Sequence, residues 1–300
     1  MPPVVEVDHL HKRYGDFVAV DDVSFSLEQG EIFGILGPNG AGKTTTVECL
    51  QGLRKADAGD LAVLGFDPRH QASHLRRHIG SQLQESALPD RMKVWEALDL
   101  FSSLAVEGAP WESVLEQWGL TEKRDAQFGS LSGGQQQRLF VALAVVNSPR
   151  LVFLDEMTTG LDPLSRRVTW DLVRQIRDGG STVVLVTHFM DEAETLCDRI
   201  AVINDRRVAA IDTPAGLIER FGGQAEVTFT TDRDDVSFLS AIDEVDSVDR
   251  EGRRVSIMGS GPVLAKVAAG LVAHGLAPLD LSVKRSTLED VFLTITGGET

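Results

Sequence analysis

The fold is decided by one stretch of sequence, Gly37-Pro38-Asn39-Gly40-Ala41-Gly42-Lys43-Thr44. It follows the apolar run 32–36, which predicts a buried strand, and it opens residues 43–52, whose pattern predicts a helix. A glycine-rich turn in that position lets backbone N–H groups converge on phosphate oxygens, while Lys43 reaches the β and γ oxygens and the Thr44 hydroxyl ligates Mg²⁺. The stretch therefore predicts a phosphate-binding loop. A glycine-rich turn before an ordinary helix is the plainer alternative.

Apolar strands alternate with helical patterns along the chain beyond this loop. Residues 151–154 and 182–186 predict strands buried on both faces, as in a parallel sheet. Helical patterns lie at residues 93–106, 133–147, 163–177 and 189–197, and short β-type runs open the chain at 4–7, 17–20 and 23–27. Residues 85–130 are helical and strand-free, which indicates a helical insertion within an α/β domain.

A second domain is predicted after Phe-Gly-Gly at 221–223, so the two domains are 1–220 and 221–300. The patterns there run strand 225–230, helix 234–241, strand 245–249, strand 254–258, helix 262–274 and strand 278–283. This βαββαβ order predicts a small α+β domain of ferredoxin-like type.

A last helix is predicted at about 287–295, because Ser286 and Glu289 have the spacing of a capping box. Val291, Phe292 and Ile295 would form an apolar face on it. We expect this C-terminal domain to steady or regulate a homodimer. The alternative, that the apolar face packs only on its own small sheet, stays open.

Composition narrows the class of protein. The 300 residues are 42% hydrophobic and 25% charged, with a net charge of −16 and no cluster of basic residues, which argues against nucleic acid as a partner. Cys49 and Cys197 are far apart and have no metal-ligand spacing, so we expect free thiols in a reducing cytosol. No apolar run reaches the roughly 18 residues that span a bilayer, and the first residues lack the pattern of a secretory signal.

A pair of acids ends the apolar strand 151–154. Asp155 is thereby placed at the carboxyl edge of the sheet, beside the phosphate-binding loop, where it can hold the Mg²⁺ shell. Glu156 can orient or deprotonate a water. Acids that are merely solvated at a strand end are the alternative.

The run Leu131-Ser132-Gly133-Gly134-Gln135 predicts a second turn into a helix. Ser132 can cap that helix, and the glycines expose N–H groups in its first turn, so this run is a candidate anion site. A simple capped start explains Ser132 but not two consecutive glycines, which weaken a helix.

Together these motifs resemble the ATP-binding subunits of ABC transporters, over residues 4 to about 220. Residues 37–44 match the Walker A motif, 131–135 the LSGGQ signature and 151–156 the Walker B motif. The resemblance implies a P-loop NTPase fold with an antiparallel β subdomain and a helical insertion. It also implies that two such domains sandwich two ATPs, with the signature of one subunit closing over the ATP of the other.

Smaller matches follow in the family's order. Tyr14 matches the ring that stacks on adenine, and Gln84 matches the Q-loop glutamine that contacts Mg²⁺ and water, with Gln82 as its rival. Asp162 matches the D-loop, which touches the partner subunit, and it is equally placed to cap a helix before Pro163. His188 matches the switch histidine that contacts the γ-phosphate.

The resemblance thus implies a complete set of site residues. The expected ATP contacts are Tyr14, Gly37, Pro38, Asn39, Gly40, Ala41, Gly42, Lys43, Thr44 and Thr45. The residues expected to act on the partner's ATP are Ser132, Gly133, Gly134, Gln135 and Asp162. The expected Mg²⁺ ligands are Thr44, Gln84 and Asp155, and the expected catalytic residues are Glu156, His188 and Gln84.

Two details refine the match. Met157 stands where the family usually has proline, which affects only the stiffness of the turn after Glu156. The tail 286–293 is similar to the C-terminal signature of bacterial export ATPases of the daunorubicin-resistance type.

The resulting expectation is an ATPase of the cytoplasm, peripheral on the inner face of the cell membrane. It would homodimerise around two Mg²⁺-ATP and dock through its helical insertion on a separate membrane-spanning permease, powering export of a drug or lipid-like substrate. One alternative is a soluble ATPase of the same family acting on nucleic acid or ribosomes, which would be expected to carry a coiled-coil insertion, two modules or basic patches. Another is a nucleotide sensor without turnover, which Glu156 and His188 oppose. Import also stays open, because export rests on the tail.

Overall fold

The computed structural model describes residues 3–82, 87–104 and 110–297. The chain divides into an N-terminal unit that ends at Pro214 and a C-terminal unit, Ala215–Gly297. The division comes six residues before the predicted one, because helix α8 (Pro214–Phe221) joins the C-terminal unit. The Ser286 hydroxyl donates a hydrogen bond to the carbonyl of Gly222, which ties the end of α8 to the segment before the last helix.

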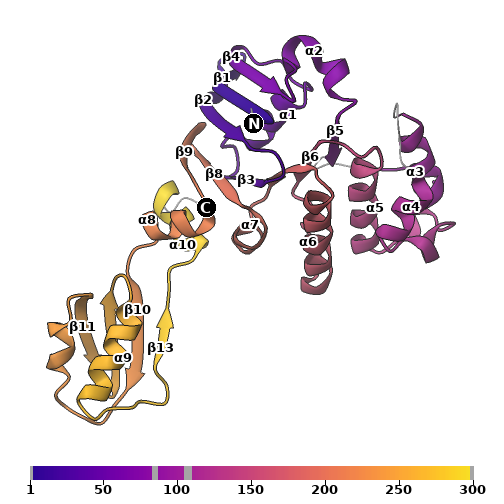
Figure 1. Cartoon of the computed structure of the whole chain (residues 1–300). Helices are drawn as coiled ribbons and strands as arrows, with labels where there is room; N and C mark the ends of the chain where they lie inside the picture. Colours follow the sequence, from indigo (N-terminus) through magenta and orange to yellow (C-terminus); the bar gives the residue numbers. More distant parts are fainter. Residues whose placement is uncertain (1–2, 83–86, 105–109, 298–300) are drawn as a thin grey trace. The chain divides into compact units, whose positions relative to one another are not determined.

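The N-terminal unit is built on a nine-stranded mixed sheet in the order β4-β1-β2-β9-β8-β3-β7-β6-β5 (Figure 1). The strands are β1 (Val5–Tyr14), β2 (Phe17–Leu27), β3 (Ile32–Leu36), β4 (Ala58–Val63), β5 (Ile79–Gln82), β6 (Leu151–Asp155), β7 (Thr182–Val186), β8 (Arg199–Asn204) and β9 (Arg207–Asp212). Strands β8, β3, β7, β6 and β5 run parallel, whereas β4, β1 and β2 are antiparallel. This confirms the α/β sheet, and it places the carboxyl ends of β3, β6 and β7 at one edge.

The N-terminal unit also contains helices among its described residues. They are α1 (Lys43–Leu50), α2 (Pro68–Leu75), α3 (Val94–Ser103), α4 (Trp111–Gln117), α5 (Gly133–Val145), α6 (Pro163–Asp178) and α7 (Met190–Leu196). Every residue of β3, β6 and β7 is buried, because helices cover both faces of these strands. That is why their sequences are continuous apolar runs rather than alternating ones.

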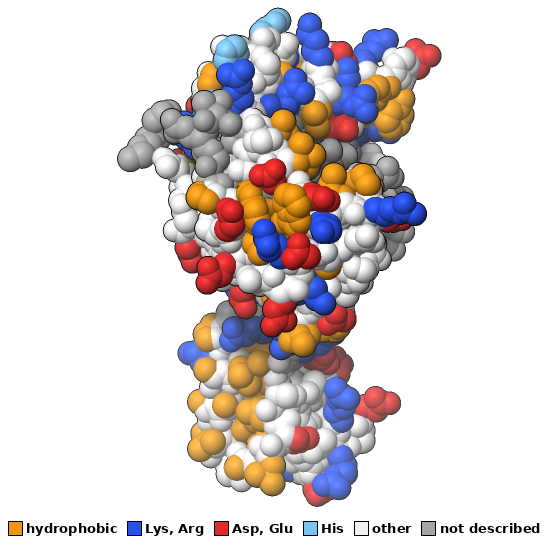
Figure 2. All heavy atoms as spheres, turned by 90° about the vertical axis from the view of Figure 1, so that its right-hand side faces the viewer, with side chains coloured by type: hydrophobic (Ala, Val, Ile, Leu, Met, Phe, Trp, Pro, Cys, Tyr) orange, Lys and Arg blue, Asp and Glu red, His pale blue; other side chains and the backbone are white. Residues whose placement is uncertain are grey.

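The predicted helical insertion is present. Among the described residues 87–104 and 110–130, it consists of α3, α4 and the short 3₁₀ turns Thr121–Lys123 and Phe128–Ser130, without an extended strand. Figure 2 faces this side of the unit and shows apolar side chains interspersed with acidic and basic ones. Two leucines of this insertion, Leu100 and Leu104, are exposed.

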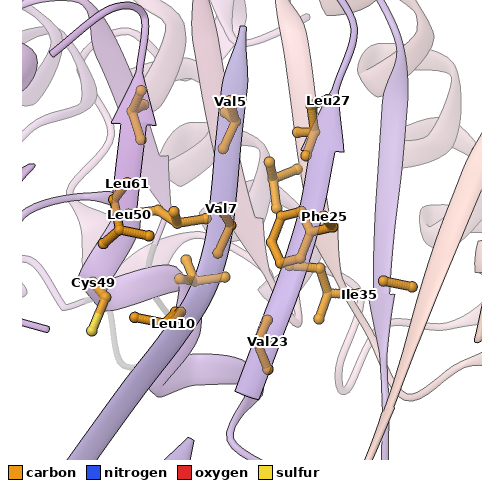
Figure 3. Close-up of a cluster of buried hydrophobic side chains, with 14 of the residues drawn as sticks. Val5, Val7, Leu10, Val23, Phe25, Leu27, Ile35, Cys49, Leu50 and Leu61 are labelled. Atoms are coloured by element: carbon orange, nitrogen blue, oxygen red, sulfur yellow. The ribbon is translucent and has the colours of Figure 1, made fainter. Parts of the chain in front are cut away.

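A buried apolar cluster anchors helix α1 to the antiparallel strands. Figure 3 shows Val7 and Leu10 of β1 near Cys49 and Leu50 of α1, and Phe25 of β2 beyond them in the same cluster, beside Ile35. Burying one such aliphatic or aromatic side chain contributes roughly 1.5–3 kcal/mol. The helix that follows the glycine-rich loop is therefore held from its carboxyl end by the core.

The C-terminal unit has its own sheet, in the order β11-β12-β10-β13, with every pairing antiparallel. Its elements are β10 (Ala225–Thr230), the 3₁₀ turn η3 (Ser237–Ala241), β11 (Val245–Glu251), β12 (Arg254–Gly259), α9 (Val263–Ala273), β13 (Ser282–Lys284) and α10 (Leu288–Thr296). Its core joins Val227 and Phe229 of β10 to Val267 and Leu271 of α9.

Three details of this unit differ from the prediction. The helix predicted at 234–241 is only the turn η3, and the strand predicted at 278–283 is reduced to β13. The capping box of α10 is formed by Thr287 and Asp290, one residue later than predicted, because Ser286 is engaged with Gly222. Val291 and Phe292 are buried, so these two residues do not present a free apolar face.

Candidate functional site

The glycine-rich loop turns from β3 into α1 through positions that admit no side chain. A Cβ at Gly37 would lie 2.3 Å from the carbonyl oxygen of Ile203, and one at Gly42 would lie 2.4 Å from that of Ala19. Gly42 also caps α1 in the left-handed region, with φ of 99°. The loop is thus pressed against β2 and β8, which leaves the first turn of α1 open at Thr44.

Lys43 lies inside this loop and is 7% exposed. Its ammonium donates to the carbonyl oxygens of Gly37 (2.8 Å) and Pro38 (3.0 Å). Burial lowers the pKa of Lys43, while the nearby charges of Glu156 and Asp155 act in the opposite direction. A cation held at the bottom of a loop of N–H donors suits a phosphate group.

Asp155 supplies a carboxylate beside this cation. It is 4% exposed, and its Oδ1 has no hydrogen-bond partner in the part of the chain that the structure describes. Burial, with a smaller contribution from the charge of Glu156, raises the pKa of Asp155 to about 6, although Lys43 acts in the opposite direction. An unpartnered, buried carboxylate oxygen near Lys43, with the exposed Thr44 next to Lys43 in the chain, fits a hard divalent cation such as Mg²⁺.

The described residues hold no group of three or more His, Cys, Asp or Glu that could bind a metal without other help. A Mg²⁺ ion held by Asp155 and Thr44 would therefore take its remaining ligands from phosphate and water, which is the usual coordination of Mg²⁺.

Glu156 and His188 end adjacent parallel strands, since β6 and β7 pair up to Asp155 and Val186. The N–H of Glu156 donates to the carbonyl of Val186 at 2.8 Å, and Glu156 has a positive φ of 50°. Glu156 Oε1 lies 3.4 Å from His188 Nδ1, with side chains that are 17% and 42% exposed. A glutamate in a sparsely populated conformation, facing a histidine at a sheet edge, is typical of a catalytic site.

Tyr14 lies at the end of β1, in register with Phe17 of β2, and both rings are about half exposed. The Lys12 ammonium lies 5.3 Å from the centroid of the Tyr14 ring. Ala19, two residues beyond Phe17, is the residue against which Gly42 is pressed. The exposed rings therefore lie close along β2 to the glycine-rich loop, where a flat apolar base could stack on one of them.

Ser132 caps α5 as expected. Its hydroxyl accepts from the N–H of Gln135, and the Gln135 side chain accepts from the N–H of Ser132 at 3.0 Å. A Cβ on Gly133 would meet no atom within 4 Å, so this first turn is open. The exposed residues Ser132 and Gly133 leave backbone donors accessible to an anion.

Asp162 caps α6, and its carboxylate accepts from the N–H groups of Leu164 and Ser165, each at 3.0 Å. Ser165 also approaches α5, because a Cβ at Gly134 would lie 3.0 Å from its hydroxyl oxygen. The fold thus brings the starts of α5 and α6 together. A hollow of about 210 Å³ between them is lined by Gly134, Arg138, Leu164, Ser165 and Val168.

Gln84 lies outside the described residues. Its rival, Gln82, is the buried last residue of β5, paired in register with Leu154 of β6. Met157 is buried as well. Cys49 and Cys197 are buried, free thiols, as expected, and burial raises the pKa of Cys49 to about 11.

The sequence reasoning missed one ionisable residue near the site, Glu192 on α7, which is completely buried. A signal was available: Glu192, Ala193 and Leu196 fall at i, i+1 and i+4, so the glutamate shares the apolar face of that helix. A carboxyl group on a buried face needs a partner, and here the indole N–H of Trp170 on α6 donates to it, with the hydroxyls of Thr187 and Thr158 nearby.

Residues 20–159 match the family model described as "ABC transporter". The chain is 38% identical over 98% of its length to the "Nod factor export ATP-binding protein I" of Burkholderia orbicola (strain AU 1054), covering 97% of that protein. It is 35% identical over 99% of its length to the "Daunorubicin resistance ATP-binding protein DrrA2" of Streptomyces coeruleorubidus, covering 95% of that protein.

Solved structures agree with these relatives. The fold superposes with a TM-score of 0.66 and 26% identity on a structure titled "Structure of ATP binding subunit of ABC transporter", covering 73% of this chain and 93% of that one. With 26% identity and a TM-score of 0.63, it also matches a dimeric bacterial ABC transporter cassette, covering 70% of this chain and 98% of the other. From its motifs, its fold and these relatives, the chain belongs to the ATP-binding subunits of ABC transporters and is an ATPase of that family.

Proposed function

We propose that two copies of this chain close around two Mg²⁺-ATP and power a separate membrane-spanning permease that exports a drug or lipid-like molecule. The observation that carries the nucleotide site is the buried pair of Lys43, inside the glycine-rich loop, and Asp155, whose Oδ1 is left without a partner among the described residues. The pair offers one positive and one negative group, as Mg²⁺-ATP requires.

In this proposal different residues bind the phosphates, the adenine and the Mg²⁺ ion. The N–H groups of residues 37–44 and the Lys43 ammonium hold the β- and γ-phosphates, while Tyr14 stacks on the adenine. Thr44, Asp155 and Gln84 would hold Mg²⁺, which neutralises charge on the phosphate oxygens when it is bound.

Glu156 and His188 would act at the γ-phosphate. Glu156 Oε1 accepts a proton from, or orients, the attacking water, and His188 contacts the γ-phosphate oxygens. The 3.4 Å distance between Glu156 Oε1 and His188 Nδ1 supports these two roles. At this distance His188 can also hold the Glu156 carboxylate in place.

Closure in trans is supported by what surrounds the exposed signature residues. Ser132, Gly133, Gly134 and Gln135 begin α5, beside Asp162 and the first turn of α6. Leu164 and Val168 in that turn are 73% and 40% exposed. Apolar side chains beside open N–H donors suit a partner subunit that brings a phosphate with it.

A groove beside the helical insertion is the proposed docking site of the permease. It has a volume of about 250 Å³ and lies between β5, α3, α5 and the end of α1, lined by residues that include Leu53, Ile79, Phe101 and Asn147. Leu53, which lines the groove, is almost half exposed. The groove is mostly apolar, so a short helical segment of the permease, apolar on one face, is the occupant that fits.

None of the described helices is long and apolar enough to cross a membrane. We propose that the chain lies at the cytoplasmic face of the membrane through the permease. Export of an amphiphilic substrate is supported by relatives whose names refer to Nod factor export and to daunorubicin and linearmycin resistance, the last of them 33% identical over 98% of this chain.

We interpret the C-terminal unit as ferredoxin-like. Its strand order places β10 and β12 at the centre, with β11 and β13 at the edges and all neighbours antiparallel, which is the arrangement expected for βαββαβ. The 3₁₀ turn η3 takes the place of the first helix. Its proposed role is to steady or regulate the homodimer.

The experiment that tests the nucleotide dimer is Glu156→Gln. This change keeps the shape of the side chain but removes the carboxylate, so ATP should bind and not be hydrolysed. The variant should run as a dimer on a sizing column with Mg²⁺-ATP and as a smaller species without it. Adding Lys43→Ala to the same chain is the control and should abolish the shift. A Glu156→Gln chain that hydrolyses ATP as a monomer would contradict the proposal.

The docking groove is tested by Leu53→Asp, with Leu279→Asp, a fully exposed site on the C-terminal unit, as the matched control. We expect Leu53→Asp to stop co-purification with the permease encoded nearest to this chain while basal ATPase activity stays unchanged. Co-purification equal to that of the control would exclude this groove.

A further inference from the structure

Helix α7, which follows His188, is held against α6 by two neighbouring side-chain hydrogen bonds. The Trp170 indole N–H donates to Glu192 Oε1 at 2.9 Å. Arg166, one turn before Trp170, donates to Asp191 Oδ2 at 3.0 Å, and its guanidinium carbon lies 4.3 Å from the centroid of the Phe189 ring. The Phe189 ring in turn lies 4.1 Å, centroid to centroid, from the ring of His188.

The Glu192 carboxyl also lies beside both strand ends that carry the proposed catalytic pair. Burial raises the pKa of Glu192, while the nearby hydroxyls of Thr187 and Thr158 and the Trp170 indole act in the opposite direction. Thr187 immediately precedes His188, and Thr158 follows Glu156 by two residues. Both threonines are completely buried. One buried side chain therefore lies close to both the segment after β7 and the turn after β6.

His188 itself is held more loosely. Its side chain is 42% exposed, and its approach to Glu156 Oε1, at 3.4 Å, is at the long limit of a hydrogen bond. Its direction must then be set by the backbone on either side of it. On one side is Thr187, whose hydroxyl accepts from the N–H of Phe189 at 3.0 Å, and on the other is Phe189 against Arg166.

We infer that Trp170 and Glu192 are positioning residues, which hold His188 in place relative to Glu156. The inference rests on the role proposed above for His188. Displacements well below 1 Å at a catalytic group lower the rate without weakening substrate binding, so the effect belongs in kcat rather than KM. The competing explanation is a buried polar pair that stabilises the fold and does nothing else.

The first test is Trp170→Phe, which keeps a ring in the core and removes the donor to Glu192. We expect kcat for ATP to fall about five- to tenfold, the size of effect that loss of one hydrogen bond produces, with KM changed less than about twofold. Glu192→Ala should lose at least as much, whereas Glu192→Gln keeps an acceptor for the indole and should restore kcat to within about twofold of wild type. Glu194→Gln, on the exposed side of the same helix, is the matched control and should leave kcat unchanged.

A double mutant separates positioning from simple stabilisation. In the full-length chain carrying His188→Ala, adding Trp170→Phe should lower the residual kcat by less than about twofold, because its effect acts through His188. The same five- to tenfold loss in both backgrounds, or an unchanged kcat in the single mutant, would overturn the inference. An unchanged kcat in His188→Ala alone would instead refute the proposed role of His188. If Trp170→Phe does not fold, Glu192→Ala replaces it in both backgrounds, with the same expectations.

Discussion

Two buried ionisable groups, Lys43 and Asp155, lie together at the proposed nucleotide site with pKa values displaced in opposite directions. Burial is the main cause for both: it lowers the pKa of Lys43 and raises that of Asp155 to about 6. The charged form of each group is poorly solvated. The phosphate of a bound nucleotide would stabilise the Lys43 ammonium, and its Mg²⁺ would stabilise the Asp155 carboxylate. The site without nucleotide is therefore less stable than it is with nucleotide, and the difference depends on pH.

Asp155→Asn should stabilise the nucleotide-free protein, and more so at higher pH. Below about pH 4 the carboxyl is protonated in both the folded and the unfolded chain, so it carries no ionisation penalty. Between about pH 4 and 6 the unfolded chain ionises first, and the full penalty is present above pH 6. The increase in the free energy of unfolding caused by the substitution should thus rise toward roughly 1–3 kcal/mol at pH 7.5. Urea unfolding at pH 5 and 7.5 in EDTA measures it.

The control for that series is Asp246→Asn, an exposed aspartate of β11, which should keep the pH dependence of the wild type. A stability difference for Asp155→Asn that is the same at both pH values would show that the carboxyl does not titrate as described.

Gly42→Ala and Gly40→Ala form a second matched pair. Both glycines have positive φ, 99° and 79°, so both substitutions strain the backbone by about 1 kcal/mol. Only at Gly42 would the new methyl group lie 2.4 Å from a carbonyl, that of Ala19, and at Gly40 it would meet nothing within 4 Å. Gly42→Ala should therefore weaken ATP binding by about tenfold or more, and Gly40→Ala by much less. Equilibrium titration with a fluorescent ATP analogue compares them.

Helices α5 and α6 begin side by side, each with a capped and exposed first turn, and this shared start is the surface proposed to meet the partner's ATP. Ser132 has a local role there as the cap of α5. Its replacement by alanine would cost about 1 kcal/mol for that reason alone. A test of action in trans must therefore compare two subunits rather than one.

Complementation makes that comparison. A Lys43→Ala chain and a Ser132→Arg chain should each be inactive, yet their mixture should recover part of the wild-type ATPase activity, measured as phosphate release. Heterodimers contain one site with both defects and one with neither. No recovery, despite heterodimers demonstrated with two affinity tags, would mean that closure is not in trans or that both sites must be intact together.

The boundaries of helices and strands were predictable where nearby residues in the sequence determine them. They differed from the prediction where residues far away in the sequence, or side-chain hydrogen bonds, determine them. Strands β3 and β7 are as predicted, because continuous apolar runs belong to buried parallel strands. Residues 17–20 and 23–27 form one strand, β2, because Asp21 between them pairs with Arg207, a partner 186 residues away. Asp235 accepts hydrogen bonds from the N–H and hydroxyl of Ser237, so the helix expected from 234 becomes the turn η3.

The positions of the residues of the proposed nucleotide site were predictable to a similar degree. Lys43, Asp155 and Glu156 belong to motifs whose chemistry depends on neighbours in sequence, and the structure brings them together as expected. Glu192 was missed because its meaning comes from Trp170 and from strand ends that only the fold makes adjacent. A glutamate in a helix gives no sign of a functional role in the sequence, because its burial is known only from the structure.

For the molecule as a whole, the described residues of the proposed nucleotide site all belong to the unit that ends at Pro214. A chain truncated after Pro214 should therefore bind ATP like the full-length protein. If the C-terminal unit stabilises the homodimer, the dimer of the truncated chain should have a dissociation constant roughly tenfold higher than that of the full-length chain. Sedimentation without nucleotide measures this. A folded truncation that self-associates and turns over ATP like wild type would leave this unit without a regulatory role, and loss of ATP binding would show that the boundary is misplaced.

Strand β3, which carries the glycine-rich loop, pairs on one side with β7 and on the other with β8, both roughly 150 residues later in the chain. On a translating ribosome, the first residues can form β1 and β2, but the strand under the loop has no neighbour until Val186 of β7 has emerged, and it lacks its second neighbour, β8, until Asn204 has emerged. At about 5–20 residues per second, synthesis of that length takes roughly 10–40 s. Throughout this interval the nascent chain exposes an unpaired apolar strand, and ATP cannot yet act as a ligand that guides its folding. The chain's need for a chaperone is therefore greatest before the last of these strands is made.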